Sequence, residues 1–225
     1  MRLFQSNHSR PAHGNIDMKK LIISGCSITH GAETVNGFMH PDNITNSYSY
    51  HLAKWMDLDL VNVALSGGSN DDIFHSLMQE INSTPTEQIH SVVAAWTCVN
   101  RLHWVNKGRH WFFISGWASS MENLYDWEFH QHSTHTAFIT GDSNSILETL
   151  HDQHRFFIDN YLDDSEYLEK KLLNYKRALR SCCEQKSIKF IDINIMDEWK
   201  EPRHPTCDEH IKIARKFYQK FYNMD

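Results

Sequence analysis

Four short runs of apolar residues recur along the sequence, and each is typical of a strand buried in a parallel sheet. They lie at residues 20–24, 58–64, 89–96 and 188–193. Segments with apolar residues at helical spacing accompany them, at residues 47–57, 71–81, 161–186 and 209–222. Strands that alternate with helices predict an α/β fold, here a three-layer α/β/α sandwich with a central parallel sheet, flavodoxin-like in its winding.

Two segments stand outside this alternation. Residues 1–17 are polar and lack the apolar stretch of a secretory signal, so we expect a flexible N-terminal leader followed by one domain over residues 18–225. Residues 101–160 carry many of the 16 histidines and a group of tryptophans. We interpret them as a partly helical elaboration over one edge of the sheet that forms a lid or a wall of a substrate site. Its tryptophans include Trp104, Trp111, Trp117 and Trp127.

Charge and cysteine content exclude several classes of protein. The chain has 22 Lys and Arg against 28 Asp and Glu, a net charge of −6, which argues against a sequence-independent grip on nucleic acid. No stretch approaches the roughly 18 apolar residues of a membrane span. The five cysteines form no C-x-x-C unit, and reduced thiols fit them better than a disulfide framework. We therefore expect a cytoplasmic protein that neither binds nucleic acid nor spans a membrane.

The first group of residues with chemical potential follows the first predicted strand. Ser27 lies in the segment 25–31 (GCSITHG), directly after that strand, at the sheet edge where open α/β folds place their ligands. Gly25 permits a sharp turn, and a following helix would direct N–H groups toward a developing anion. Ser27 is therefore a candidate nucleophile. The alternative is a serine that only caps a helix.

The second group lies near the other end of the chain, in the segment 201–205 (EPRHP). His204 stands between prolines, in a rigid loop just before an amphipathic helix. Glu201 is a candidate to accept a hydrogen bond from one of its ring nitrogens, which would leave the other nitrogen as a base. The alternative is a surface loop with an incidental ion pair.

A metal site and a thiol nucleophile are weaker hypotheses. Five histidines have ligand-like spacings but form no H-E-x-x-H pair, and we interpret them as a solvated or aromatic-packed surface rather than metal ligands. These are His130, His132, His135, His151 and His154. Cys98 and Cys207 have no base at a recognisable spacing and are interpreted as core or surface thiols. The sequence thus predicts neither a metal nor a cofactor.

Taken together, the segments resemble the SGNH/GDSL hydrolase family, in blocks placed between Leu21 and Phe221. The family's G-D-S-x-x-x-G block is similar to residues 25–31, and its Asn-to-Gly block after the second strand is similar to residues 62–67 (NVALSG). Its D-x-x-H-P block resembles residues 201–205, and the stretch D-E-H-I-K-I-A that follows resembles the family's G-H-x-x-I-A continuation.

The resemblance implies a catalytic triad and an oxyanion hole. Ser27 corresponds to the nucleophile, His204 to the base and Glu201 to the carboxylate, while Ser27 and Gly67 supply oxyanion N–H groups. Three departures accompany it. Cys26 replaces an aspartate, Glu201 lengthens the triad arm by one methylene, and the G-x-N-D block is imperfect. Asn100 is the candidate for its oxyanion-binding asparagine, with Thr97 as a rival.

The implied function is a serine hydrolase that cleaves carboxylic esters, including O-acyl groups on carbohydrate. The tryptophans of the elaboration suit stacking against a sugar face, which favours a carbohydrate ester. Two alternatives remain open. One is a catalytically weak or inactive carbohydrate-binding module on the same fold, as the imperfect third block would suggest. The other is an O-acyltransferase, which would use the same triad.

Overall fold

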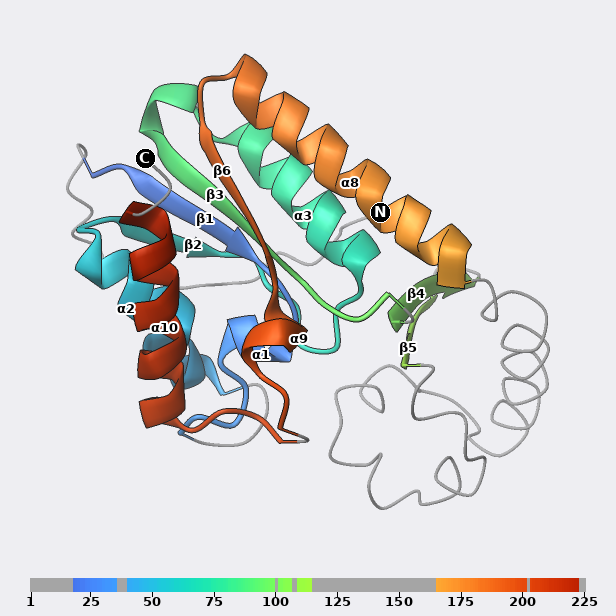
Figure 1. Ribbon diagram of the computed structural model, residues 1–225, viewed down its shortest axis with the longest axis horizontal. Helices are drawn as coiled ribbons and strands as arrows, with labels where there is room; N and C mark the ends of the chain where they lie inside the picture. The colour runs from blue at the N-terminus through green and yellow to red at the C-terminus, as the bar shows by residue number, and fades with distance from the viewer. Residues whose placement is uncertain are drawn as a thin grey trace.

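A parallel sheet of four strands forms the centre of the protein (Figure 1). The computed structural model describes residues 18–35, 40–99, 101–106, 109–114, 165–201 and 203–222. The strands lie in the order β2-β1-β3-β6, so the chain winds outward in both directions from β1, as in flavodoxin-like folds. Their bounds are β1 Lys20–Ser24, β2 Asp59–Asn62, β3 Ile89–Trp96 and β6 Lys189–Asn194.

Helices cover both faces of the sheet, which confirms the three-layer α/β/α architecture predicted from the sequence. Helices α2 (Tyr48–Trp55) and α10 (Cys207–Tyr222) lie together on one face. Helices α3 (Asn70–Ser83) and α8 (Ser165–Gln185) lie on the other (Figure 1). Short elements complete the described chain: α1 Ser27–His30, α9 Ile195–Glu198, and the 3-10 helices Pro41–Asn46 and Thr86–Gln88.

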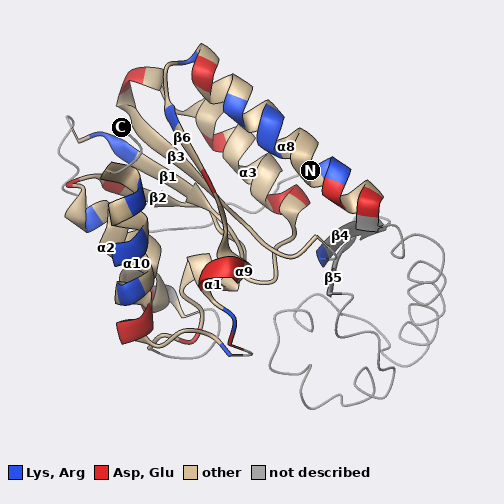
Figure 2. Ribbon diagram, in the orientation of Figure 1, with Lys and Arg blue, Asp and Glu red and all other residues tan. Residues whose placement is uncertain are grey.

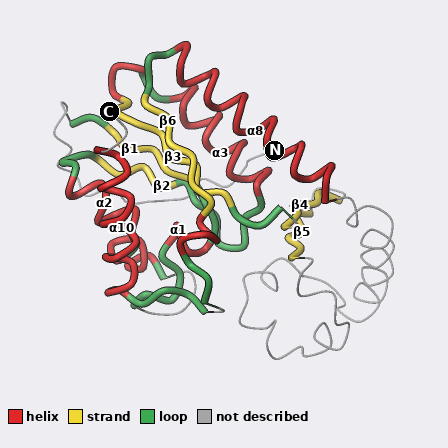
Figure 3. The backbone as a smooth tube through the Cα atoms, in the orientation of Figure 1, coloured by secondary structure: helices red, strands yellow, loops and turns green. Residues whose placement is uncertain are grey.

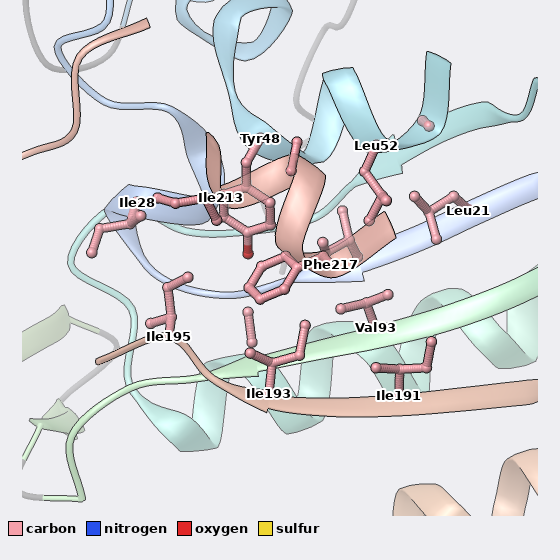
Figure 4. Packing of buried hydrophobic residues seen from close by; sticks show 14 of the residues in the cluster. Leu21, Ile28, Tyr48, Leu52, Val93, Ile191, Ile193, Ile195, Ile213 and Phe217 are labelled. Carbon is pink, nitrogen blue, oxygen red and sulfur yellow. The ribbon is translucent and has the colours of Figure 1, made fainter. Parts of the chain in front are cut away.

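Two buried clusters hold the layers together. In the first, Phe217 of α10 and Tyr48 of α2 pack with the strand residues Val93 and Ile193 (Figure 4). In the second, apolar residues of α3 and α8 pack against the opposite side of β1 and β3. Residues alternate between the two clusters along β1 and β3, because successive side chains of a strand point to opposite faces. Burying each large apolar side chain contributes roughly 1.5–3 kcal/mol.

Charged residues lie mainly on the outer faces of α8 and α10, whereas the strands are largely uncharged (Figure 2). Glu166 and Lys170, four residues apart on α8, form the ion pair that their spacing predicts, with Oε1 and Nζ 2.5 Å apart.

The end of the second strand and the start of α3 differ from the predicted bounds, and a side-chain hydrogen bond explains each difference. The second strand ends at Asn62, earlier than the predicted residue 64, because the Asn62 side chain accepts a hydrogen bond from the Ala64 N–H at 3.0 Å and turns the chain. Helix α3 begins one residue earlier than predicted. There, Ser69 and Asp72 form a capping box, in which each side chain bonds the other residue's backbone N–H.

The start of the segment 101–160 is an antiparallel hairpin of β4 (Arg101–Asn106) and β5 (Arg109–Ile114). Trp104 and Trp111 are directly opposite each other in this hairpin. The predicted leader, Trp117, Trp127 and the five histidines of the metal hypothesis lie outside the described residues. None of the helices in the part of the chain that the structure describes is sufficiently long and apolar to cross a membrane.

Candidate active site

The carboxyl ends of the parallel strands meet a set of loops at one edge of the sheet (Figure 3). Ser27 follows β1 after two residues and begins the short helix α1, where it is almost completely buried. His204 lies in the loop between α9 and α10. The fold thus brings the loop that follows β1 close to the loop between α9 and α10.

Ser27 and His204, 177 positions apart in sequence, are in direct hydrogen-bond contact. The His204 Nε2 atom lies 2.9 Å from the Ser27 Oγ atom. The His204 Nδ1 atom lies 2.8 Å from Oε2 of Glu33. Because an ionised carboxylate can only accept hydrogen bonds, Nδ1 carries the proton in the neutral ring, and the Nε2 lone pair accepts from the Ser27 hydroxyl.

The carboxylate at Nδ1 corrects the sequence prediction, which assigned this position to Glu201. Glu201 is exposed, and the structure places its charge near Arg203, whose pKa is raised mainly by hydrogen bonds to Glu209 and further by the charge of Glu201. The physical reason lies in the loop itself. The contacts of Arg203 with Trp199 and Glu209 hold this loop, and none of them directs the Glu201 side chain toward His204.

The loop that carries His204 is held by contacts with α9 and α10. The Trp199 indole N–H donates to the Arg203 carbonyl at 2.6 Å. The Arg203 guanidinium bonds both carboxylate oxygens of Glu209 at 2.8 Å. Glu209 also accepts from the Thr206 N–H, which caps α10. Arg203 and this N–H hold the pKa of Glu209 well below its usual range, so the carboxylate stays charged and the loop stays fixed.

A polar network beneath α1 fixes the nucleophile turn. The Asn62 side-chain amide donates to the Thr29 carbonyl and to the Ser49 hydroxyl, both at 2.9 Å. The Thr29 hydroxyl contacts the Tyr48 hydroxyl at 2.8 Å. Burial raises the pKa of Tyr48, so it remains a neutral hydrogen-bonding group. The network connects β2, α1 and α2 and therefore determines where Ser27 is presented.

Replacing Asn62 by alanine is expected to destabilise the fold by about 2 kcal/mol, because the Ala64 N–H loses its partner and the Thr29 carbonyl and Ser49 hydroxyl each lose one hydrogen bond. The free energy of unfolding in urea measures this. Asn46→Ala is the control: Asn46 bonds only neighbouring residues at the surface, and its loss should cost less than about 0.5 kcal/mol. Equal losses for the two variants would contradict the role given to Asn62.

Gly25 is required at the end of β1 by close packing. A Cβ atom at this position would lie 2.0 Å from Oγ1 of Thr29, far inside contact distance. The tight turn lets the chain pass from the strand into α1 within two residues. Glycine is therefore required here because a larger residue would collide with the Thr29 side chain.

The oxyanion candidates are distributed over two neighbouring loops. Gly67 lies in the loop after β2, with a left-handed φ of +79° that glycine adopts without penalty. This loop lies beside the nucleophile turn, because the Leu65 N–H donates to the Gly25 carbonyl at 3.1 Å. The approach of the Gly67 N–H to Ser27 remains a prediction.

The third block is organised by a residue that sequence reasoning missed. The Asn70 side chain accepts from the Thr97 N–H at 3.0 Å and donates to the Thr97 carbonyl at 3.1 Å. Thr97 is buried, with its hydroxyl 3.8 Å from the Cys98 sulfur. Its backbone N–H is thus committed to Asn70. Asn100, the other oxyanion candidate, lies outside the described residues.

The alternative thiol and metal sites gain no support from the described residues. The Cys207 thiol donates to the Thr34 carbonyl at 3.1 Å, and Cys98 contacts Thr97. Within the described ranges, no group of three or more His, Cys, Asp or Glu side chains is arranged to hold a metal ion. Neither thiol contacts a histidine in the hydrogen bonds found there.

His210 is a second histidine near the site, fully buried on α10. Its Nδ1 atom accepts from the Tyr48 N–H at 3.1 Å, and its ring stacks on the Tyr48 ring with centroids 6.1 Å apart. Burial, together with the smaller effect of the charges of His51 and His204, lowers the pKa of His210 to about 3. His210 is therefore neutral across the physiological range and supports the Tyr48 backbone rather than exchanging protons.

Glu33 is the main residue at this site that the sequence analysis did not identify. It comes six residues after Ser27, and no spacing rule of the segment 25–31 extends to it. The only local signal is Gly31, which ends α1 with a left-handed φ of +88°. After this turn, the Gly31 and Ala32 N–H groups both bond the Ser27 carbonyl, so the chain folds back past the serine.

No family model and no curated protein matches the sequence. Solved structures similar to the chain include a lipolytic protein of the G-D-S-L family from Desulfitobacterium hafniense DCB-2. It is 12% identical, with 89% of this chain and 98% of that chain covered, at a TM-score of 0.34. An acetyl xylan esterase from Butyrivibrio proteoclasticus is 13% identical, with 92% and 64% covered, at a TM-score of 0.40.

A salicylyl-acyltransferase of a tetracycline biosynthetic pathway is also similar, at 14% identity and a TM-score of 0.42. There, 94% of this chain and 57% of that chain are covered. The similar structures are thus esterases, carbohydrate esterases and an acyltransferase.

Proposed function

We propose that this protein is a serine hydrolase that cleaves carboxylic esters, with Ser27 as the nucleophile and His204 as the general base. The observation that carries this proposal is the 2.9 Å contact between Ser27 Oγ and His204 Nε2. A serine hydroxyl is a weak nucleophile until a base within hydrogen-bond reach accepts its proton. A carboxylate on the far nitrogen of that base completes the arrangement that acyl-transfer enzymes use.

The reaction follows from this geometry in two halves. The Ser27 oxygen forms a bond to the ester carbonyl carbon while its proton passes to His204 Nε2. The tetrahedral intermediate then collapses, the carbon–oxygen bond to the alcohol breaks, and His204 returns the proton to the leaving oxygen. Water attacks the acyl-enzyme in the same way, with His204 as base, and releases the carboxylic acid and free Ser27.

The negative charge of the intermediate requires donors near Ser27. We assign the N–H groups of Ser27 and Gly67 to this role, together with the Asn100 side chain. The loop of Gly67 is bonded to the nucleophile turn through Leu65 and Gly25, which supports the first part of this assignment. One such donor typically lowers the barrier by about 3 kcal/mol.

The substrate we favour is an ester of a carbohydrate. The β4–β5 hairpin begins five residues after β3 ends, and the Arg101 guanidinium bonds the carbonyl of Gly68, next to Gly67, at 3.4 Å. The hairpin therefore starts beside the loop of Gly67, which is bonded to the nucleophile turn through Leu65 and Gly25. Trp104 and Trp111, opposite each other on it, are the aromatic residues that would contact a sugar ring.

Covalent labelling of Ser27 tests the proposed chemistry directly. Incubation with a fluorophosphonate is expected to add one phosphonyl group to the protein, and peptide mass spectrometry should place it on Ser27. Ser27→Ala is expected to abolish the label, while Ser83→Ala, at an exposed serine that ends α3, should retain it. Label on another serine, or none on the folded wild-type protein, would refute the proposal.

A panel of substrates separates the substrate classes. Acetylated sugars and chromogenic esters of increasing acyl length are compared by kcat/KM, with the released acid measured alongside the ester consumed. Ester loss without equivalent acid release in the presence of a free sugar would indicate transfer to that sugar rather than hydrolysis. Sugar binding without turnover or labelling would identify a binding module.

A further inference from the structure

The segment that carries Glu33 is held in place without help from the Glu33 side chain. The Thr34 hydroxyl donates to the Gly31 carbonyl at 2.8 Å and to the Asn43 carbonyl at 3.1 Å. The Val35 N–H donates to the Asn43 side-chain oxygen at 3.1 Å, and Asn43 is fully buried. Asn43 thus holds the segment in place through its backbone carbonyl and its side-chain oxygen.

The same segment is bonded to the element that follows His204. The Cys207 thiol, at the start of α10, donates to the Thr34 carbonyl at 3.1 Å. Thr34 adjoins Glu33, and Cys207 comes three residues after His204. This contact therefore fixes the distance between the backbone that carries the carboxylate and the backbone that carries the imidazole.

Glu33 itself adopts an unfavourable backbone conformation. Its φ is +64°, in the left-handed region that side chains with a Cβ seldom occupy, and glutamate is not among the residues that favour it. Its side chain is 54% exposed and contacts His204 Nδ1, so core packing does not explain the strain. Strain of this kind persists where the conformation places a functional group.

We propose that Glu33 is the positioning residue for His204 and that Glu201 has no part in this. This inference rests on the proposed function, because it names the residue that supplies the carboxylate of the same site. The carboxylate comes from the segment that follows the nucleophile. The spacing of the EPRH motif predicts instead that it comes from the loop that carries the base. Glu33 holds Nδ1 protonated, keeps Nε2 directed at Ser27, and stabilises the imidazolium that forms when Ser27 gives up its proton.

Glu33→Gln and Glu201→Gln form a matched pair of tests. Glu33→Gln keeps the size of the side chain and the backbone conformation but removes the charge. We expect kcat for a chromogenic ester to fall roughly 100-fold or more, with KM changed less than about threefold, because the residue acts in the transition state and not in substrate binding. Glu201→Gln is expected to change kcat by less than about twofold.

Glu33→Gly separates positioning from structural support. Glycine adopts the left-handed φ without strain, so this variant is expected to melt at the same temperature as the wild type or above it. It should nevertheless lose activity as Glu33→Gln does. Added acetate, which can occupy the vacated space, should restore part of kcat in Glu33→Gly but not in Ser27→Ala.

The outcomes distinguish the two hypotheses. Loss of kcat in Glu201→Gln with full activity in Glu33→Gln would overturn the assignment of Glu33 and leave the hydrolase intact. Loss of activity in Glu33→Gln together with a lower melting temperature in Glu33→Gly would show a structural role instead. A wild-type protein that neither turns over esters nor reacts with a fluorophosphonate would remove the proposed function itself.

Discussion

Replacing His204 by alanine is expected to lower esterase kcat/KM by roughly 10⁴-fold or more, because Ser27 loses the base that accepts its proton. The rate of fluorophosphonate labelling at Ser27 should fall with it. The variant should still fold: the His204 side chain is 24% exposed and lies in a loop fixed by Trp199, Arg203 and Glu209. We expect its melting temperature to stay within about 2 °C of the wild type.

His90→Ala provides the matched control for this prediction. His90 lies near the beginning of β3, at the amino-terminal edge of the sheet, where its Nδ1 contacts the neighbouring Ser91 hydroxyl. Its loss should leave turnover and labelling within about twofold of the wild type. Full activity in His204→Ala would mean that the contact with Ser27 has no catalytic role.

The fold was predictable because its signals are local or periodic. The runs at β1 and β3 are continuous apolar segments of the right length, and the helices between them show a buried face. Their alternation leaves few arrangements other than a parallel sheet covered on both sides. The positions of Ser27 and His204 follow from the same reasoning, since residues that follow parallel strands collect at one edge of the sheet.

The carboxylate at His204 was not predictable in this way. Its position depends on the left-handed turn at Gly31 and Glu33, on the side chain of Asn43, and on a thiol contact from α10. None of these is encoded in a spacing near His204. A motif can therefore indicate that a histidine needs a carboxylate without indicating which loop provides it.

Asn70 illustrates a second kind of limit. Its amide bonds the backbone of Thr97, 27 residues later, and fixes the end of β3 beside the loop of Gly67. In the sequence it reads as an ordinary polar residue just before a predicted helix. Side chains that satisfy distant backbone groups are visible only once the fold is known, because any nearby polar residue could serve.

Acidification should destabilise the folded protein through His210. Burial lowers the pKa of His210 to about 3, against an ordinary value of 6.5, so the unfolded chain binds a proton at pH values where the folded chain does not. The contribution to stability is fully present above pH 6.5 and declines as pH falls toward 3. The free energy of unfolding that is lost through His210 between pH 7.5 and pH 5 is about 2 kcal/mol.

The variant His210→Asn isolates this effect. The asparagine side-chain oxygen can accept from the Tyr48 N–H as His210 Nδ1 does, but it does not titrate. The variant should be less stable at pH 7.5, because it lacks the ring that packs on Tyr48, yet its free energy of unfolding should decline less steeply with acid. Charges of His51, His204 and Glu209 act on His210 in the folded state, and these residues are unchanged in the variant. The difference between the two urea-unfolding profiles from pH 7.5 to 5 therefore reports His210 alone. Parallel profiles would show that acid sensitivity, if present, arises elsewhere.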